Sequence, residues 1–472
     1  MAEREKRLIA FVVYPGVTPL DLVGPLTVLR DLKLGTPYRT VVVGERLEAL
    51  ATDTSLHVTP ARTFADVPAP YAVFVPGGGT ATIQAMQDQA LLSYLQQAAG
   101  SAEIVGSTGN GALLLAAAGL LDGRRAATHW AYADLLEAHG ATSVADGWVE
   151  DGRFLTAAGG TAGIDAMLHL TARLRSLSAA RLAQLWMEYD PQPPFGRPDA
   201  VAASSELGAH LRDRPATGAA GHGGPAMSQM TDDSVRRTIA IVLYPDLTAL
   251  DLVGPLQVLA ELERFAPGYR TVVVGPTVEP MATDVGLGLV PDAPFSDLAH
   301  PDVLLVPGGR QGTIRALSDP VIREYVRTAA SSARIVASVC TGSLILASVG
   351  MLDGRRATTN WAFQSVLDRL GGRYVRERWI HDGRLVMSAG VSAGIDMALY
   401  LAAVLTDEAT ARRIQQAIDY DPQPPFGGID WDHLPLLARL ARAAIGVAAP
   451  FIAAKPRRLT RTALSRHAER AA

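Results

Sequence analysis

The chain has 472 residues, with 43 Lys and Arg against 47 Asp and Glu, a net charge of −4, and a single cysteine, Cys340. Hydrophobic residues make up 48% and charged residues 19%, a balance that supports a large buried core and excludes wholesale disorder. One thiol excludes the paired cysteines of a secreted disulfide framework, so we expect a cytoplasmic protein. The weakly acidic charge predicts no direct binding to nucleic acid.

The first apolar run, Leu8 to Tyr14, reappears as Ile239 to Tyr244, inside the chain where no signal peptide can lie. Both runs are therefore predicted to be buried first strands. No uninterrupted apolar run reaches the roughly 18 residues that a membrane-spanning helix needs. The best C-terminal candidate is Ala443 to Ala454, and the sequence predicts no transmembrane segment.

The chain contains two copies of one sequence repeat. Leu20 to Leu26 recurs unchanged as Leu250 to Leu256, and the correspondence continues, with one residue of slippage, to Tyr189–Gly196 and Tyr420–Gly427. A repeat of this length indicates a tandem duplication of a whole domain, unlike the short period of a solenoid.

The repeat divides the chain into two domains, residues 1–196 and 236–430, with a flexible linker at 197–235 and a basic helical tail at 431–472. The linker holds a run of small residues, Ala216 to Pro225.

The tail has six basic residues and one acidic residue from Lys455 onward. The favoured interpretation is a solvated C-terminal helix, so we expect no membrane contact by the tail; the alternative is an amphipathic segment for an anionic membrane surface or a partner helix.

Within each copy, short β-branched runs alternate with helical patterns. In the second copy the expected strands are Thr238–Leu243, Arg270–Val274, Asp302–Val306 and Arg334–Ser338, with helices such as Leu252–Phe265 and Val321–Ser331 between them. This alternation predicts two α/β domains, each with a mainly parallel sheet covered by helices on both faces. Function is then expected outside the carboxyl ends of the strands.

Cys340 follows one of these strands and precedes the helical run Gly342 to Ala347. A sharp strand-to-helix turn presents such a side chain, and a helix N-terminus is expected to stabilise its thiolate as a nucleophile. The alternative is a buried cysteine that acts as a small hydrophobe. The first copy has Gly109 at this position, so the chemistry is expected in the second domain only.

Asp251 lies after the first strand of the second copy, in a loop that is predicted to meet the same crevice. A carboxyl group close to a thiolate has a raised pKa, which suits proton transfer. The alternative is a helix cap, which the retained Asp21 of the first copy also favours.

Pro307-Gly308-Gly309 directly follows another strand, where the N–H groups of Gly308 and Gly309 are candidates for substrate binding or an oxyanion site. A tight turn explains the glycines equally well. Thr341 is expected either to bond the substrate or intermediate, or to cap its helix. The sequence has no paired cysteines or clustered histidines, which predicts no metal site.

With these residues in place, both copies resemble the DJ-1/PfpI superfamily of flavodoxin-like, class I glutamine amidotransferase-like domains, and within it the isonitrile hydratase branch. A histidine follows the cysteine in PfpI-type proteases, where this chain has Thr341, and DJ-1 has a glutamate where this chain has Asp251. The second copy departs from the family at Asn360-Trp361, where the first copy keeps the usual His129-Trp130. The resemblance rests on the motifs Leu250–Pro255, Val306–Gly309, Ser338–Leu344, Gly350–Thr359, Ala393–Asp396 and Tyr420–Phe426.

The resemblance implies a lyase that adds water to an isonitrile to give an N-substituted formamide, with no cofactor. Cys340 would form a thioimidate, Asp251 would move protons, and Thr341 would orient the reacting groups. It also implies that the two domains pair within one chain as a pseudo-dimer, with the first domain a pseudo-enzyme.

Two other functions remain open. One is a non-catalytic small-molecule-sensing or regulatory module related to the ligand domain of AraC-type regulators, although the residues after Gly428 are too few for their DNA-binding part. The other is a DJ-1-like glyoxalase or stress-protection activity.

Overall fold

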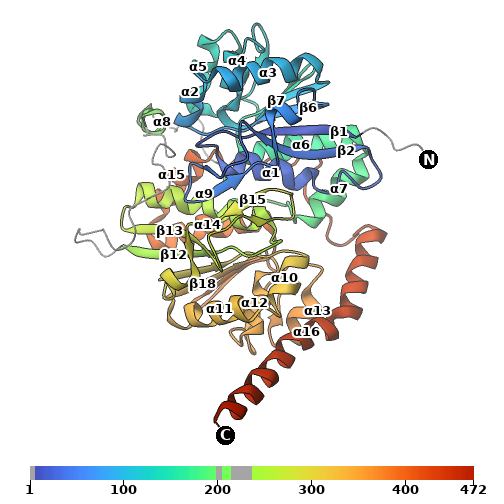
Figure 1. The fold of residues 1–472 in the computed structure, drawn as a ribbon, viewed down its shortest axis with the longest axis vertical. Coiled ribbons are helices and arrows are strands. Elements are labelled where there is room, and N and C mark those ends of the chain that lie inside the picture. Colours follow the sequence, from blue (N-terminus) through green and yellow to red (C-terminus); the bar gives the residue numbers. More distant parts are fainter. Residues whose placement is uncertain (1–5, 198–204, 214–235, 472) are drawn as a thin grey trace.

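The computed structural model describes residues 6–197, 205–213 and 236–471, except the side chains of 205–206 and 455–471. Most of the expected linker, residues 198–204 and 214–235, lies outside the described residues. Figure 1 shows the two halves of the chain as two α/β units, one above the other. The predicted α/β class with mainly parallel sheets is confirmed.

Each half forms a seven-stranded sheet in which only the strand pair at one edge is antiparallel. The central strands are buried on both faces, which agrees with their continuous β-branched and apolar sequences. In the first half the order is β10 (Trp148–Asp151), β11 (Phe154–Ala157), β7 (Ile104–Ser107), β6 (Ala72–Val75), β1 (Arg7–Val12), β2 (Tyr38–Gly44) and β5 (Arg62–Thr63). In the second half the order is β16 (Ala293–Pro294), β13 (Tyr269–Gly275), β12 (Arg237–Val242), β17 (Val303–Val306), β18 (Ile335–Val339), β22 (Leu385–Ser388) and β21 (Trp379–Asp382).

Helices cover both faces of each sheet. The outer helices of the first half are α2 (Thr80–Ala85), α3 (Gln89–Ser101), α4 (Ala112–Ala117) and α5 (Ala133–Ala138), and those of the second half are α10 (Gln311–Ala316), α11 (Pro320–Ser332), α12 (Gly342–Ser348) and α13 (Gln364–Arg369). The inner helices are α1 (Pro19–Leu29), α6 (Gly160–Leu174), α7 (Leu177–Trp186), α9 (Ala249–Phe265), α14 (Val391–Leu405) and α15 (Glu408–Ala417).

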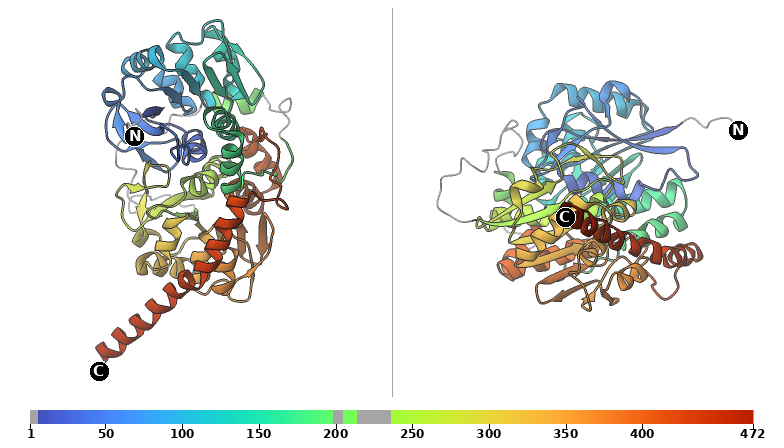
Figure 2. Two further views of the ribbon diagram at one scale, coloured as in Figure 1. Left: turned by 90° about the vertical axis from the view of Figure 1, so that its right-hand side faces the viewer. Right: turned by 60° about the horizontal axis from the view of Figure 1, so that its bottom comes forward.

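The inner helices form a layer between the two sheets, as Figures 1 and 2 show. Helix α1 of the first half packs against α9 of the second. Both helices are buried around most of their circumference because each has its own sheet on one side and the other domain on the other. Their apolar residues therefore serve two interfaces at once.

A small four-stranded antiparallel sheet joins the halves. Strands β3 (Leu50–Ala51) and β4 (His57–Thr59) come from the first half, and β14 (Met281–Ala282) and β15 (Gly288–Val290) come from the second. The joining pair is β4 with β15, where Val58 lies opposite Leu289. Two further two-stranded ladders lie within single halves, β8 (Arg125–Ala126) with β9 (Thr142–Ser143), and β19 (Arg356–Ala357) with β20 (Arg373–Tyr374).

The segments that follow α7 and α15 cross between the halves in a reciprocal way. The backbone N–H of Gln192 donates to Asp396 Oδ2 at 3.0 Å, and the N–H of Gln423 donates to Asp165 Oδ2 at 2.8 Å. These four residues occupy matching positions in the repeat. The segment that carries the Tyr189–Gly196 motif therefore anchors one domain to the other.

The described part of the expected linker is structured. Residues Ser205–Arg212 form helix α8, in which Leu207 and Leu211 are buried. Arg212 donates to the carbonyl oxygen of Ala131 at 2.7 Å, and the Tyr132 hydroxyl donates to that of Leu211 at 3.3 Å. The linker composition had concealed this short helix, which is held by packing onto the first domain.

The tail forms helix α16 (Leu436–Ala471), whose first half packs against α13. Leu440, Val447 and Phe451 are more than half exposed. The stretch Leu436–Ala454 is long and apolar enough, by length and composition alone, to cross a membrane. The count of uninterrupted apolar residues had missed it because Arg439 and Arg442 interrupt the run.

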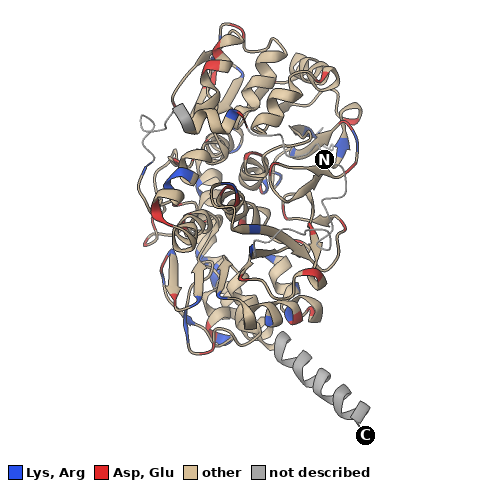
Figure 3. Ribbon diagram, turned by 90° about the vertical axis from the view of Figure 1, so that its left-hand side faces the viewer, with Lys and Arg blue, Asp and Glu red and all other residues tan. Residues whose placement is uncertain are grey.

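Charged residues of both signs are intermixed over both halves. Figure 3 shows lysine and arginine interspersed with aspartate and glutamate on the face of the molecule that it draws.

Candidate active site at Cys340

Cys340 occupies a strained turn between β18 and α12. Its φ of 55° lies in the left-handed region, which residues other than glycine rarely adopt. Three hydrogen bonds hold the backbone there: the Cys340 N–H donates to Ser388 O at 2.9 Å, and the hydroxyls of Ser343 and Thr359 donate to Cys340 O at 3.1 and 3.2 Å. The predicted sharp strand-to-helix turn is confirmed.

Asp251 lies beside Cys340, in the first turn of α9 and not in a loop as expected. It is fully buried, and neither carboxyl oxygen has a hydrogen-bond partner within the described ranges. Burial, with a further contribution from the negative charge of Asp284, raises the pKa of Asp251 to about 8, against a smaller opposing effect of the Cys340 thiol. The helix-cap alternative is wrong, because Thr248 is the cap residue and Asp251 bonds no backbone N–H.

The expectation of a thiolate stabilised by the helix N-terminus is also wrong. Cys340 keeps partial exposure to a pocket, but its surroundings are dehydrated enough that burial raises the pKa of the thiol well above its usual value. The carboxyl groups of Asp251 and Glu188 raise it further. Desolvation and two acidic neighbours outweigh the seven-residue helix α12. At neutral pH the resting site therefore contains a thiol and a carboxylic acid.

Thr341 and Gly309 are hydrogen-bonded to each other. The Gly309 N–H donates to Thr341 Oγ1 at 2.9 Å, and the Thr341 hydroxyl in turn lies 2.8 Å from Gly309 O and 2.9 Å from Thr313 Oγ1. The N–H of Gly309 is thus already used, and Thr341 makes no side-chain cap for α12. Of the two predicted glycines, Gly308 is the one whose N–H has no bond to another group of the described chain.

The pocket in front of Cys340 is built by both domains, and the residues that the first domain supplies were not among the predicted site residues. It encloses about 420 Å³ including its mouth, and the first domain supplies Arg30, Trp186 and Met187 to its lining. Arg30 forms an ion pair with Asp284 of the second domain, and Arg310 lies over the Trp186 ring at 4.6 Å from its centroid. The cysteine domain alone would leave this pocket open on one side.

Glu188 of the first domain is the second acid near the cysteine. It has a φ of 49°, is 5% exposed, and its Oε1 accepts the Trp361 N–H at 2.7 Å. Burial raises the pKa of Glu188 to about 7, although the Trp361 N–H and the charge of Arg378 lower it. The available signal was its place next to the repeated Tyr189–Gly196 motif, but only the paired domains show that it lies near Cys340.

The departure at Asn360 has a structural explanation. Asn360 Oδ1 accepts the Ala362 N–H at 3.2 Å, and His129 Nδ1 accepts the Ala131 N–H at 3.3 Å in the first domain. The two side chains make the same local turn, so either residue type satisfies the backbone. Asn360 also lines the cysteine pocket.

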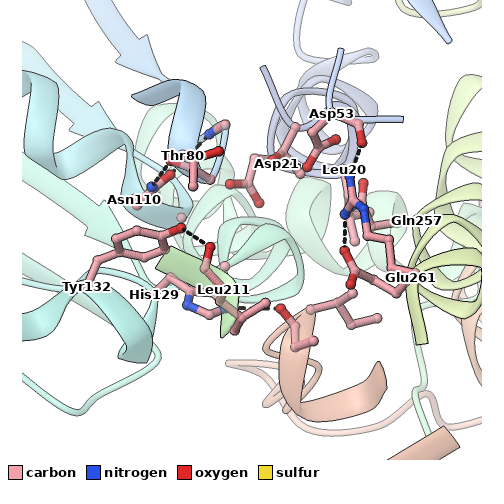
Figure 4. A pocket seen from close by; sticks show the side chains of 18 residues that line it. Leu20, Asp21, Asp53, Thr80, Asn110, His129, Tyr132, Leu211, Gln257 and Glu261 are labelled. Carbon is pink, nitrogen blue, oxygen red and sulfur yellow. Dashed lines mark hydrogen bonds and ion pairs between the residues drawn. The ribbon is translucent and has the colours of Figure 1, made fainter. Parts of the chain in front are cut away.

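The first domain keeps the turn but has glycine in place of the cysteine. Gly109 has a φ of 56°, matching Cys340, yet a Cβ placed there would lie 1.9 Å from Asp21 Oδ2. Asp21 accepts the Gly77 N–H at 3.2 Å and occupies the space that a cysteine side chain would need. Figure 4 shows Asp21 in a second pocket at this elbow.

Fold and site together define a duplicated α/β protein whose one cysteine lies at a strained strand-to-helix turn. The family model for the DJ-1/PfpI family matches residues 7–173 and 237–404. The chain belongs to the DJ-1/PfpI family, as two tandem domains.

Several known proteins are similar to parts of the chain. Isonitrile hydratase of Pseudomonas putida is 41% identical over 188 residues, which are 40% of this chain and 80% of the relative. The HTH-type transcriptional regulator CdhR of Pseudomonas aeruginosa is 31% identical over 167 residues, 34% of this chain and 48% of the regulator. A THiJ/PfpI family protein from Pseudomonas syringae has a crystal structure that matches with 32% identity and a TM-score of 0.42, over 50% of this chain and 97% of that one.

Proposed function

We propose that the second domain is a cysteine-dependent hydratase that converts an isonitrile to an N-substituted formamide. The observation that carries this proposal is the dehydrated pair of Cys340 and Asp251 at the elbow. The 41% identity with an isonitrile hydratase supports the choice of substrate. The pocket needs no cofactor for this chemistry, because both groups that move protons or form bonds belong to the chain.

The first step forms a thioimidate. The Cys340 sulfur bonds to the terminal carbon of the isonitrile while the neutral Asp251 carboxyl donates its proton to the same carbon. The thiol proton passes to Asp251, which is again neutral. The thiol has thus added across one carbon, and no free thiolate has to form beforehand.

The second step consumes water. The water oxygen bonds to the thioimidate carbon, Asp251 gives a proton to the nitrogen and takes one from the water, and the carbon–sulfur bond then breaks. The sulfur recovers a proton as the carbonyl of the formamide forms. The free N–H of Gly308 is the group suited to stabilise the developing charge on oxygen.

Thr341 has a positioning role in this proposal. Its three hydrogen-bond contacts tie the loop of Gly308 and Gly309 to the elbow. The first domain performs no chemistry, because Gly109 has no nucleophile, but it supplies one wall of the pocket. We also propose that this pairing within one chain stands in for the association of two separate copies, since linked domains meet at a high effective concentration.

The test is formamide production from cyclohexyl isonitrile, followed by gas chromatography and mass spectrometry. Cys340→Ser is expected to lower the rate about a thousandfold or more, because the oxygen nucleophile is far less reactive at neutral pH. Ser107→Ala is the matched control at the elbow of the first domain; its hydroxyl is buried without a partner, and its activity is expected to be that of the parent. Equal rates in the parent and Cys340→Ser would overturn the proposal.

A second candidate is small-molecule sensing without turnover. It is supported by the 31% identity to a transcriptional regulator and by the loss of the cysteine from one domain. The same assay separates the candidates when methylglyoxal is included as a further test compound. A ligand that raises the melting temperature of Cys340→Ser and parent equally, with no product in either, would favour sensing.

A further inference from the structure

Helix α16 exposes an unusual number of large apolar side chains. Eleven such side chains are exposed among the described residues, and five of them belong to this one helix. Single exposed apolar residues are normal on a protein surface, but a group of them on one element marks an interaction surface. The five are Leu436, Leu437, Leu440, Val447 and Phe451, which are 56% to 76% exposed.

These side chains form a face of α16 that is separate from its contact with the second domain. Four of the five recur at intervals of four, seven and four residues, which places them on one side of a helix. Ala438, Ala449 and Ile452 are buried on the opposite side, in the part of α16 that packs against α13. Figure 2 shows α16 along the outside of the second half of the chain. The helix therefore has two apolar faces, of which the fold uses one.

Basic residues accompany the exposed face. Arg439 and Arg442 are exposed on the same stretch of helix, and six basic residues against one acidic residue follow from Lys455 onward. Apolar side chains next to basic ones match the surface of a bilayer that contains anionic phospholipids, where the apolar groups enter the acyl boundary and the cations meet the phosphates.

The packing and the charge favour a bilayer surface over two other environments of the helix. Leu436–Ala454 is long enough to cross a membrane, but crossing would pull Ala449 and Ile452 away from the second domain, whereas lying on the surface leaves that contact intact. A second copy of this chain would bring the same basic stretch with it, and like charges repel. An anionic bilayer supplies the opposite charge.

We propose that α16 is a membrane-surface helix, whose exposed apolar face inserts at the headgroup boundary of an anionic bilayer while the basic residues bind the lipid phosphates. This assignment selects the alternative to the solvated helix that the sequence favoured. It does not depend on the hydratase proposal, because the cysteine pocket has no part in it.

The experiment is co-sedimentation of the full-length protein with vesicles. Binding to vesicles of phosphatidylcholine and phosphatidylglycerol is expected to be at least about tenfold stronger than binding to phosphatidylcholine alone, and to weaken as sodium chloride is added. Absence of binding to either vesicle, equal binding to both, or binding that salt leaves unchanged would overturn the proposal.

Val447→Asp is the matching variant, because it places a carboxylate on the exposed apolar face. It is expected to bind the anionic vesicles at least about tenfold more weakly, since it removes an inserted side chain and adds a charge that the lipids repel. Val321→Asp, the same change at an exposed valine of α11, is the control and is expected to bind as the parent does.

Two further results would overturn the proposal. One is parental vesicle binding by Val447→Asp. The other is a solution mass of two chains for the parent and one chain for Val447→Asp, without vesicle binding, which would show that a second copy covers this face. If Val447→Asp does not fold, as judged by its thermal transition, the comparison of the two vesicles with the parent protein decides by itself.

Discussion

One position, 340 in the second half and 109 in the first, separates two sites that are otherwise built alike. Both elbows have the same left-handed φ, and in both the neighbouring aspartate is buried with its pKa raised to about 8. The raised pKa of the aspartate is therefore a property of the shared fold, and the two sites differ locally in the cysteine side chain. Asp21 has closed the space in the first half, so Gly109→Cys would collide with it and would not create a second copy of the site.

Glu188→Gln removes a negative charge that acts on Cys340. Because this charge raises the pKa of the thiol, the variant is expected to lower that pKa. The measurement is the pH dependence of alkylation by iodoacetamide, which has Cys340 as its sole thiol target. Asp190→Asn is the control, because it removes a nearby charge that is not among the main groups that shift the pKa of Cys340. An unchanged alkylation profile in Glu188→Gln would contradict the assignment.

The proposed chemistry requires the protonated form of Asp251. Since the pKa of Asp251 is raised to about 8, kcat/KM is expected to fall as pH rises through this value. Asp251→Asn is expected to lower kcat/KM by about a hundredfold or more and to remove this dependence, because the amide cannot transfer a proton in the same way. A rate that rises steadily to pH 10 would show that an ionised thiol is the reacting species.

At the scale of elements, helices and strands from both halves complete each pocket. Helix α9 carries Asp251 to the side of Cys340 and Gln257 to the other pocket, and the β4–β15 ladder joins the two halves. A substitution in that ladder, far in sequence from Cys340, is thus expected to alter the cysteine pocket by moving Arg30 and Trp186, which line it.

Val58→Asp places a carboxylate at a fully buried position of the β4–β15 ladder. It is expected to lower the free energy of unfolding by about 3 kcal/mol, because an unpaired charge is costly to bury. Separation of the halves should also speed alkylation of Cys340. Leu47→Asp, at a residue that is 57% exposed, is the control and should change neither quantity; a Val58→Asp protein with parental stability and alkylation rate would contradict the role of the ladder.

At the scale of the whole molecule, the core holds an unusual set of buried carboxyl groups. Burial raises the pKa of Asp21 and Asp251 to about 8, and that of Asp165, Glu188 and Asp292 to about 7. In the unfolded chain these groups ionise near pH 4. Between pH 4 and 8 the folded protein therefore binds more protons than the unfolded chain.

This excess of protons predicts how stability depends on pH. Protonation of these groups stabilises the folded state fully below about pH 4, and this stabilisation is lost as pH rises through 7 to 8. Each excess proton in the folded state lowers the free energy of unfolding by about 1.4 kcal/mol for each unit of increasing pH. The free energy of unfolding, from urea titrations at pH 5.5 and 8, is expected to be lower at pH 8 by about 3 kcal/mol or more. Equal stability at the two values, or greater stability at pH 8, would show that the carboxyl groups are ionised in the fold.

Much of each domain was predictable from local sequence. The expected strand Arg334–Ser338 is β18 at Ile335–Val339, and the expected helix Val321–Ser331 is α11 at Pro320–Ser332, because β-branched runs and an Asp319 cap specify local structure. The start of α9 was placed three residues late, which left Asp251 in a loop. Pro255 within the helix obscured its beginning.

The sequence by itself determined the duplication, the α/β class of each copy, and the gathering of Cys340, Asp251 and Gly308 at the carboxyl ends of neighbouring strands. These features follow from periodicity and from the geometry of a parallel sheet, which act over a few residues or one crossover. The protonation of the site and the contributions of Arg30, Glu188 and Gln257 across the domain boundary were decided by tertiary structure alone. Desolvation and contact between distant segments depend on how the two halves pack, and no local pattern encodes that packing.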